Sequence, residues 1–458
     1  MRKILVANRG EIAVRIIRAC HDLGLETVAV YSQTDKEALH VLHADEAICI
    51  GEAPSNKSYL KIPHILSACE VTGADAIHPG YGFLSENANF ASICESCGVT
   101  FIGPHPDTIR QLGDKAQAKA TAKEAGCPVI PGSEGVVETV EEGLAIAKEF
   151  GFPIFIKASA GGGGRGIRLV QHEQEFERLF LAARTEAEAC FGNPDLYIEK
   201  MIVNPRHIEV QIIADTHGNC VHLGERDCTI QRRRQKLIEE TPSPALTPEM
   251  RDDIGDAAVR LAEKANYSSV GTVEFLLDSE KNFYFMEVNT RVQVEHTVSE
   301  ELTGIDIVKE QIEIAQGKPL PFTQKDVRFS GHVMQFRINA EDPCSDFRPS
   351  PGRLEYYVAP GGPHIRVDSA CYAGYAISPH YDSMIAKLIV QGNTREEAIR
   401  RAKRALAEFH IGGVKTTIAF HIDMLEHEAF LNGKFDLGYV DALIEQGYRF
   451  GDIEASGE

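Results

Sequence analysis

The sequence predicts an α/β protein that opens with a doubly wound parallel sheet, and three observations lead to this fold class. Residues 3–7 (KILVA) form a short apolar run, and residues 12–20 carry apolar side chains three and four positions apart. Residues 26–31 (ETVAVY) then return to strand composition. A strand, a helix and a second strand in this order form a βαβ unit, whose strands lie parallel.

The pattern of strands and helices continues along the chain. Residues 74–78 and 99–103 again read as a strand followed by a turn, and residues 114–125 read as a helix. A second α/β region follows, with a capped helix over 139–151 and an apolar strand over 153–157 that runs into a glycine loop.

The later part of the chain is richer in strands, so the expected fold class is α/β at the start of the chain and α+β further on. Residues 207–215 alternate between apolar and polar side chains, and 216–219 (THGN) form a hairpin turn. Residues 284–296 (YFMEVNTRVQVEH) also alternate, which predicts one long strand with a polar face and an apolar face. A last helix is expected over 394–409.

Composition excludes several classes of protein. The 458 residues carry 47 Lys and Arg against 67 Asp and Glu, a net charge of −20, which argues against nucleic acid or an anionic membrane as a partner. No apolar stretch is long enough for a membrane span, and Arg9 and Glu11 come too early for a signal peptide. We therefore expect a cytoplasmic protein. The scattered cysteines fit reduced thiols better than disulfides, and Cys94 and Cys97 lack the second pair of ligands that zinc would need.

Two polar patterns indicate chemistry. The glycine run 161–166 (GGGGRG) offers bare backbone N–H groups to phosphate oxygens, although alone it fits a flexible surface loop equally well. It has neither the P-loop order nor the place of a dinucleotide fingerprint. Glu274 lies in an apolar strand, where an unpaired carboxylate is costly. Together with Glu287 and Asn289 it offers the oxygen ligands that suit Mg²⁺ held with phosphates, so we expect a metal site.

The densest basic run is 231–236 (QRRRQK). Such a run is commonly a solvated or nucleic-acid-facing patch, but the acidic total makes nucleic acid a poor partner. Guanidinium and ammonium groups beside a metal–triphosphate site would clamp a small anionic substrate.

At this point the sequence resembles a known family over essentially its whole length, the biotin carboxylases of the ATP-grasp fold. The motifs that carry the resemblance occur in order: ILVANRGEIAVRIIRA, HPGYGFLSEN, IKASAGGGGRGIR, NPRHIEVQ, GERDCTIQRRRQK, EVNTRVQVEH, RINAEDP and YDSMIAKL.

The resemblance implies a Rossmann-like N-terminal domain, a mobile ATP-grasp lid and a larger C-terminal ATP-grasp and biotin carboxylase domain. We place the first domain with its linker at 1–113, the linker helices and lid at 114–203, the C-terminal domain at 204–446 and a tail at 447–458.

The resemblance also implies the site residues. The ATP site would comprise Lys115, Lys157, Gly163, Gly164, Glu199, Lys200, Met201, Ile202, His207, Gln231, Arg234, Glu274 and Glu287. Glu274, Glu287 and Asn289 match the family's ligands for Mg²⁺, with Mn²⁺ as the alternative ion.

The bicarbonate pocket would comprise Lys236, Arg291, Gln293, the Val294 backbone and Glu295. Among these Glu295 resembles the general base, while Arg291 and Lys236 hold the anion. Arg337 resembles the residue that faces the biotin ureido oxygen, and Tyr81 and Gly82 would wall the biotin pocket.

Two positions depart from the family pattern. Arg234 stands where the family usually has His, and its longer, permanently charged side chain can still reach phosphate or ribose. Ala160 replaces the usual glycine at the head of the loop, which stiffens one residue.

The function implied is ATP-dependent carboxylation of biotin with bicarbonate, through carboxyphosphate. The sequence contains no Met-Lys-Met biotinylation sequence, so biotin would ride on a separate carrier protein, with carboxyltransferase subunits elsewhere and a homodimer as the expected assembly. The acceptor would be acetyl-CoA, in malonyl-CoA and fatty acid synthesis, or else pyruvate or 2-oxoglutarate.

Three alternatives compete with this interpretation. Another ATP-grasp ligase would lack the RVQVEH and RINAEDP pairing, and a silent nucleotide-binding protein would not need Glu295 and Arg337 intact. A Rossmann oxidoreductase would need a GxGxxG motif at the first βα turn, which here is 8–11 (NRGE).

Overall fold

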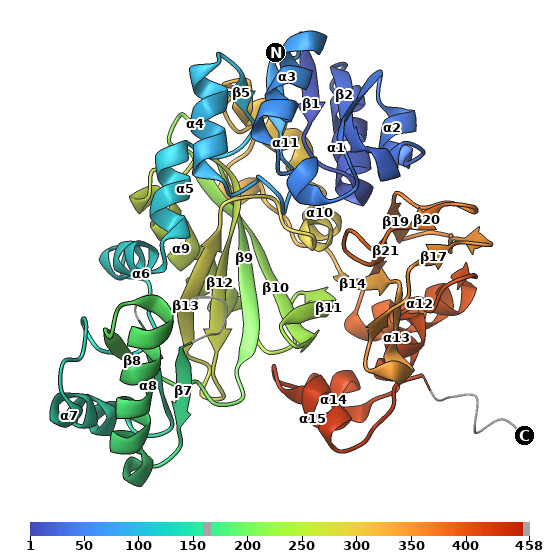
Figure 1. The fold of residues 1–458 in the computed structure, drawn as a ribbon. Helices are drawn as coiled ribbons and strands as arrows, with labels where there is room; N and C mark the ends of the chain where they lie inside the picture. The colour runs from blue at the N-terminus through green and yellow to red at the C-terminus, as the bar shows by residue number, and fades with distance from the viewer. Residues whose placement is uncertain (159–165, 452–458) are drawn as a thin grey trace, which may run out of the picture. The chain divides into compact units, whose positions relative to one another are not determined.

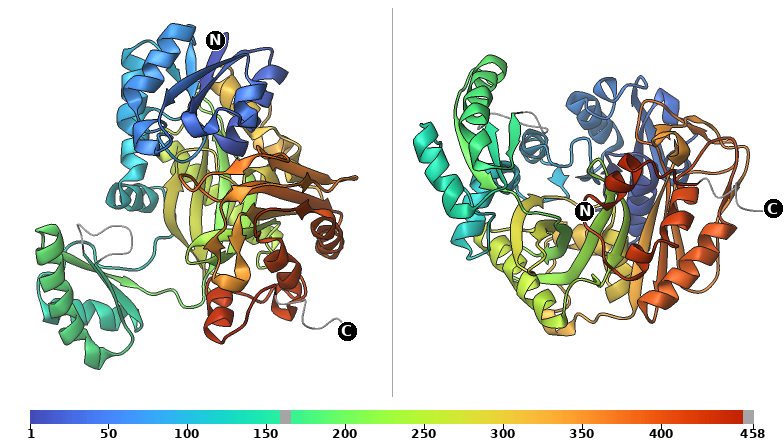
Figure 2. Two further views of the ribbon diagram at one scale, coloured as in Figure 1. Left: turned by 45° about the vertical axis from the view of Figure 1, so that its right-hand side comes forward. Right: turned by 90° about the horizontal axis from the view of Figure 1, so that it is seen from below.

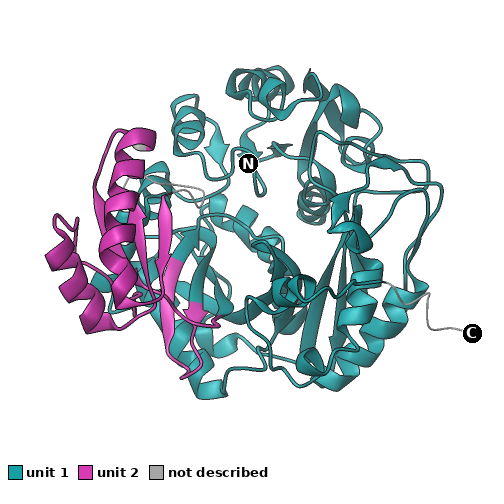
Figure 3. Cartoon of the chain, turned by 60° about the horizontal axis from the view of Figure 1, so that its bottom comes forward, with its two compact units in different colours: residues 1–127, 206–275, 287–458 teal, residues 128–205, 276–286 magenta. Residues whose placement is uncertain are grey.

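The computed structural model describes residues 1–158 and 166–451. The chain forms two compact units (Figure 3): unit 1 comprises residues 1–127, 206–275 and 287–458, and unit 2 comprises residues 128–205 and 276–286. Most of the predicted glycine loop, including Gly163 and Gly164, lies outside the described residues. Within the described ranges, no helix is both long enough and apolar enough to cross a membrane.

Unit 1 begins with the parallel sheet that the sequence predicts. Its strands run in the order β3-β2-β1-β4-β5, and all neighbours are parallel. The first strand is fully buried, and Gly24 follows the first helix with a positive φ of 69° that suits glycine. The elements are β1 (Lys3–Val6), α1 (Gly10–Asp22), β2 (Glu26–Ser32), α2 (Leu39–His43), β3 (Glu46–Gly51), α3 (Ile62–Thr72), β4 (Ala76–His78), α4 (Ala88–Ser96), β5 (Thr100–Phe101), α5 (Pro106–Gly113) and α6 (Lys115–Glu124).

A large sheet fills the rest of unit 1, with the strand order β13-β12-β9-β10-β11-β14-β21-β19 (Figure 1). Its pairs from β9 to β19 are antiparallel. The strands are β9 (Arg206–Ala214), β10 (Cys220–Arg232), β11 (Gln235–Thr241), β12 (Ser269–Leu277), β13 (Phe283–Asn289), β14 (His332–Asn339), β19 (Ile365–Ser369) and β21 (Met384–Gly392). The ends of β12 and β13 that meet at their turn, residues 276–286, belong to unit 2.

Helices pack on this sheet and enclose the core. The first, α9 (Pro248–Lys264), contacts β9 and β10, while α10 (His296–Thr303) contacts β10, β11, β14 and β21. The expected last helix is α12 (Arg395–Glu408), which lies along β21 in Figures 1 and 2 and is capped by the Thr394 hydroxyl. Its buried stripe contains Ala398, Ala402 and Leu406, as the periodicity predicts.

The remaining elements of unit 1 are short. They are α11 (Ile307–Ala315), α13 (Ile418–Met424), α14 (Glu428–Leu431), α15 (Tyr439–Glu445) and three pairs of strands, β15 (Glu341–Asp342) with β16 (Arg348–Pro349), β17 (Gly352–Arg353) with β20 (Ala376–Ile377), and β18 (Tyr357–Val358) with β22 (His410–Ile411).

In the described part of residues 128–205, unit 2 contains a three-stranded antiparallel sheet and two α-helices. The strands β6 (Ile154–Ala158), β7 (Ile167–Val170) and β8 (Leu196–Lys200) run in the order β7-β6-β8 and share a core with α7 (Val140–Phe150) and α8 (Phe176–Phe191). The Thr139 hydroxyl accepts a hydrogen bond from the Glu142 backbone, which is the predicted cap of α7.

One predicted strand is wrong over half its length. We expected a single strand over 284–296, but β13 ends at Asn289 and α10 begins at His296, so the intervening residues form a loop. At the start of this loop the Thr290 backbone N–H donates to the Glu86 carboxylate at 3.1 Å, in place of a neighbouring strand. The strict alternation of two faces therefore stops at Asn289.

Candidate active site

The centre of unit 1 holds charged side chains on strands that are otherwise apolar. Every residue of β9 is buried, so both of its faces are covered. Ile208 and Val210 point to one side and Glu209 and Gln211 to the other, because side chains alternate along a strand. A buried charge is tolerated only where it has partners. The polar side of this sheet is therefore a network of paired charges.

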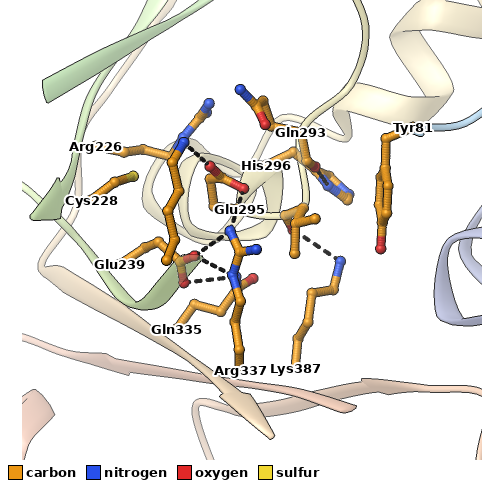
Figure 4. Close-up of polar contacts among 12 residues, drawn as sticks. Tyr81, Arg226, Cys228, Glu239, Gln293, Glu295, His296, Gln335, Arg337 and Lys387 are labelled. Carbon is orange, nitrogen blue, oxygen red and sulfur yellow. Dashed lines mark hydrogen bonds and ion pairs between the residues drawn. The ribbon is translucent and has the colours of Figure 1, made fainter. Parts of the chain in front are cut away.

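Glu295 is the centre of this network (Figure 4). Its carboxylate is fully buried and accepts from the Lys236 ammonium at 2.5 Å and from the Arg337 guanidinium at 2.9 Å. Burial alone would raise the pKa of Glu295. The positive charges of Lys236, Arg337 and Arg226 outweigh burial and hold this pKa well below its usual range. Glu295 is thus ionised between two cations.

Lys236 joins three carboxylates at one point. Its Nζ lies 2.6 Å from Glu209 and 3.2 Å from Glu274, besides Glu295. Burial would lower the pKa of Lys236, but the three carboxylates raise it well above the usual value. Arg226 is also fully buried; it pairs with Glu209 and donates to Gln211, Thr272 and Ser299.

Arg337 is held in the same way by a second buried carboxylate. Its Nε donates to Glu239 at 2.6 Å, and Gln335 donates to the other oxygen of Glu239 at 2.9 Å. Burial raises the pKa of Glu239; Arg337 opposes this rise, and the nearby charge of Glu295 adds to it. Glu239 thus holds the Arg337 guanidinium against Glu295.

The Glu274 carboxylate accepts hydrogen bonds from four side chains. Asn289 and Gln293 donate to one of its oxygens at 2.9 and 3.0 Å, Lys236 also donates to it, and His207 Nε2 donates to the other oxygen at 3.0 Å. The Gln231 amide donates to His207 Nδ1 at 3.3 Å, which fixes the proton of the ring on Nε2. Despite its burial, the pKa of Glu274 lies below its usual range because of Lys236 and His207.

The loop before α10 is fixed by Arg291. Its guanidinium donates to Asn289 at 2.9 Å, to Gln293 at 3.1 Å and to Glu86 at 2.8 Å. The site therefore forms one continuous network from Arg337, through Glu295, Lys236 and Glu274, to Arg291. The sequence predicted all five of these residues.

The three predicted metal ligands fit a divalent cation by their chemistry. Burial raises the pKa of Glu287 and the negative charge of Glu274 raises it further, so the two carboxylates repel each other. A divalent cation between them would relieve this repulsion. Lys115 lies 3.8 Å from Glu287 with an 86% exposed side chain, and the Asn289 oxygen accepts from Arg291. His207, Glu209 and Glu274 also bring ligand atoms within 4.8 Å of one another.

The predicted biotin wall borders a cavity of about 260 Å³ in unit 1. Tyr81 and Gly82 line it, with Glu11, His380 and Asp382. The Tyr81 hydroxyl donates to the Glu11 carboxylate.

The remaining predicted residues lie outside this network. In unit 2, Lys157 forms an ion pair with Glu199, and Lys200, Met201 and Ile202 follow at the end of β8. Arg234 is exposed in the turn between β10 and β11, with a positive φ of 67°. The basic run divides at this turn: Arg232 is buried beside Asp346, whereas Lys236 enters the site.

Sequence reasoning missed Glu209, Arg226, Glu239, Gln335 and Lys387, which hold the predicted residues in place. Lys387 alone carried the signal that Glu274 carries, a charged residue inside an apolar strand, whereas the other four lie on strands that contain further polar residues.

Models of known protein families match three consecutive parts of the chain. A model of the biotin carboxylase N-terminal domain matches residues 1–109, and one of the biotin carboxylase C-terminal domain matches 335–442. Between them, a model of the carbamoyl-phosphate synthase L chain ATP binding domain matches 114–323. With the fold above, this defines an ATP-grasp protein.

Individual relatives specify the family. Biotin carboxylase of Nostoc sp. is 58% identical, with 96% of this chain and 99% of the relative covered. One of the pyruvate carboxylase subunits of Methanothermobacter thermautotrophicus is 53% identical, with 96% and 89% covered. The crystal structure of the Hydrogenobacter thermophilus 2-oxoglutarate carboxylase biotin carboxylase domain dimer, in complex with MgADP, ADP and bicarbonate, has a TM-score of 0.89 at 51% identity, with 97% and 98% covered. The chain belongs to the biotin carboxylase family and is an ATP-dependent ligase.

Proposed function

We propose that this enzyme carboxylates biotin on a separate carrier protein, with bicarbonate and ATP, as the first half-reaction of acetyl-CoA carboxylase. The observation that supports this most directly is the buried Glu295 carboxylate between Lys236 and Arg337. The reaction uses two substrates in succession: bicarbonate, which is an anion, and the biotin ring, which is neutral and becomes an anion. A base with one cation on each side suits such a reaction.

In the first step Glu295 takes the proton of bicarbonate. Lys236 and Arg291 hold the anion with Gln293 and the Val294 backbone, in line with the γ-phosphate of ATP. Attack on phosphorus forms carboxyphosphate and releases ADP. The closed site must exclude water, because carboxyphosphate hydrolyses.

The low pKa of Glu295 affects this step. A carboxylate held by two cations is a weak base. A bicarbonate anion that draws Lys236 toward itself removes positive charge from Glu295 and raises its pKa. The base would therefore gain proton affinity only when the substrate is in place.

In the second step carboxyphosphate decomposes to CO₂ and phosphate. The phosphate takes the proton from biotin N1′, and Arg337 stabilises the enolate that results, which then attacks CO₂. Glu239 and Gln335 keep the guanidinium oriented for this. We assign the cavity at Tyr81 and Gly82 to biotin.

ATP would be bound by the full set implied by the family resemblance. This set comprises Lys115, Lys157, Glu199, Lys200, Met201, Ile202, His207, Gln231, Arg234, Glu274 and Glu287. Gly163 and Gly164 complete it from outside the described residues. Glu274, Glu287 and Asn289 would hold Mg²⁺ or Mn²⁺, which supplies positive charge to the phosphates.

The partners follow from the chemistry. A carrier protein must bring biotin, a carboxyltransferase must use carboxybiotin, and the dimer described for the Hydrogenobacter domain supports a homodimer here. The domain boundaries 1–113, 114–203 and 204–446 stay a prediction. Relatives that serve pyruvate and 2-oxoglutarate carboxylases make these the competing acceptors.

The first experiment measures ADP release and carboxybiotin formation with Mg·ATP, with and without bicarbonate and free biotin. We expect turnover that requires bicarbonate and rises with biotin. Arg337→Met should keep the KM for ATP and lose carboxybiotin formation. Lys264→Met, at an exposed pair with Glu124, is the matched control and should behave as wild type.

Two outcomes contradict the proposal. ATP turnover that ignores bicarbonate and biotin would move the function to another ATP-grasp ligase or to a silent nucleotide-binding protein. Full carboxylation by Arg337→Met would remove Arg337 from the mechanism. Reconstitution with the carrier and carboxyltransferases from the same source, with acetyl-CoA, pyruvate and 2-oxoglutarate in turn, identifies the acceptor.

A further inference from the structure

Lys387 is a buried cation that the proposed mechanism does not use. It lies on β21, its side chain has no exposed surface, and its strand neighbours Ala386 and Leu388 belong to the apolar core. Burial of an ammonium group is costly unless it is paired and hydrogen-bonded. The partners of Lys387 therefore indicate what it holds.

Its ammonium contacts two parts of the site that are far apart in the sequence. It donates to the backbone carbonyl of Val294 at 3.1 Å and forms an ion pair with Glu11 at 3.0 Å, with Asp368 further away at 4.0 Å. Glu11 in turn accepts the Tyr81 hydroxyl. Figure 4 shows Lys387 between Arg337 and Tyr81.

The hydrogen bond to the Val294 carbonyl affects the position of the general base, Glu295. The Val294 carbonyl belongs to the peptide that joins Val294 to Glu295, so a donor to it fixes the direction in which the Glu295 side chain leaves the backbone. The Val294 backbone needs such a donor because β13 ends at Asn289, and the described loop between β13 and α10 is not hydrogen-bonded to a neighbouring strand. The second contact bears on Tyr81, which lines the cavity assigned to biotin.

We propose that Lys387 is a positioning residue whose single buried charge fixes both the backbone of the Glu295 base and, through Glu11, the Tyr81 wall of the biotin cavity. This inference rests on the proposed function, in which Glu295 removes the proton of bicarbonate. Lys387 itself touches no reacting atom. Its loss should therefore change turnover and biotin recognition while ATP recognition stays the same.

Three variants separate positioning from folding. Lys387→Met leaves the Glu11 carboxylate buried without its cation, so it should unfold more easily. Glu11→Gln keeps the bond from Lys387 to Val294 but changes the partner of Tyr81. Glu11→Gln with Lys387→Met removes both charges and should recover stability, yet the Val294 carbonyl still lacks its donor.

The measurements are the kcat of bicarbonate-dependent ADP release, the KM values for ATP and free biotin, and the thermal midpoint by circular dichroism. We expect kcat to fall between about tenfold and a hundredfold in Lys387→Met and in the double variant. Glu11→Gln should lower kcat less than Lys387→Met does and raise the KM for biotin several-fold. The KM for ATP should be unchanged in all three.

A double variant that recovers both its thermal midpoint and its kcat would overturn the inference, because Lys387 would then serve only the fold. So would a loss of kcat in Glu11→Gln as large as that in Lys387→Met. Wild-type enzyme without bicarbonate-dependent turnover would instead refute the proposed function, and the two failures are therefore distinguishable.

Discussion

Replacement of Arg337 by Met tests whether the Glu239 carboxylate is ionised only because Arg337 lies beside it. Glu239 is fully buried, and its pKa is already raised by burial despite Arg337. Met keeps most of the length of the side chain and removes the charge. Among the described residues, Glu239 would then retain only Gln335 as a donor, and it should take up a proton when the protein folds.

The size of the effect follows from the ordinary pKa of 4.5 for this carboxyl. Protonation of such a group on folding at pH 7 costs up to about 3.4 kcal/mol, because each unit between pH and pKa is worth about 1.36 kcal/mol. The pKa of Glu239 is already raised in the folded wild type, so the wild type already loses part of this free energy. We therefore expect a loss of about 2–3 kcal/mol at pH 7, which shrinks by up to about 1.4 kcal/mol per unit as the pH falls toward 5.

At neutral pH the loss of Arg337 lowers stability through both carboxylates that it contacts, although the two depend on pH in opposite directions. The pKa of Glu239 is raised in the folded protein, so its contribution to stability is present below 4.5 and is lost as the pH rises. The pKa of Glu295 is lowered, so its contribution is present above 4.5 and is lost as the pH falls through its folded value. The loss of Arg337 makes both contributions less favourable at neutral pH.

The assay is urea unfolding followed by circular dichroism, since the chain has no tryptophan. Wild type, Arg337→Met and Arg337→Met with Glu239→Gln are compared at several values between about pH 5.5 and 7.5. The Glu239→Gln change should restore most of the stability and remove most of the pH dependence. An equal loss for Arg337→Met at both ends of this range, or no recovery in the double variant, would refute the reasoning.

Three further predictions concern single carboxylates. Glu287→Gln should raise the Mg²⁺ concentration for half-maximal ATP turnover at least about tenfold, measured by metal titration, with a thermal midpoint no lower than that of the wild type because the pKa of Glu287 is raised. Burial and the charge of Glu313 raise the pKa of Glu310 to about 7, so its contribution to stability is lost as the pH rises through that value. Glu310→Gln should therefore raise the thermal midpoint at pH 8 and leave it unchanged near pH 5. Asp35→Asn removes the buried partner of the Arg9 guanidinium, at 2.7 and 2.8 Å, and should cost about 3–5 kcal/mol in urea unfolding; a loss below about 1 kcal/mol would contradict this.

The sequence predicted the parts of the fold that depend on local pattern. The opening strand, helix and strand over residues 3–31, and the helix over 394–409, follow from apolar periodicity and capping residues that lie within a few positions of each other. The strand expected over 284–296 ends early because Thr290 and Arg291 bind Glu86, more than two hundred residues away. No local pattern contains that contact.

The same distinction applies to the site. Glu274 was recognisable because a carboxylate in an apolar run needs partners, and the family resemblance supplied the roles of Lys236, Glu295 and Arg337. The supporting residues were not found, because alternation of charged and apolar residues along β9 and β10 also fits strands with one solvent-exposed face. Only the burial of all positions of β9 shows that the polar side is covered.

The pair of Glu209 with Arg226 shows why a prediction of the hairpin does not by itself predict the site. From the turn at 216–219, the register places Cys220 opposite Ala214 and His222 opposite Ile212. Continued without interruption, it would place Arg226 opposite Ile208, on the apolar side. A register shift between His222 and Glu225 instead brings Arg226 opposite Glu209.

Gly224 lies within this shift with a positive φ of 79°, and a glycine inside a strand is the one sequence signal of such a bulge. A shift of one residue exchanges the faces of a strand. The bulge at Gly224 therefore decides whether the Arg226 guanidinium joins the network around Glu295 or faces the core.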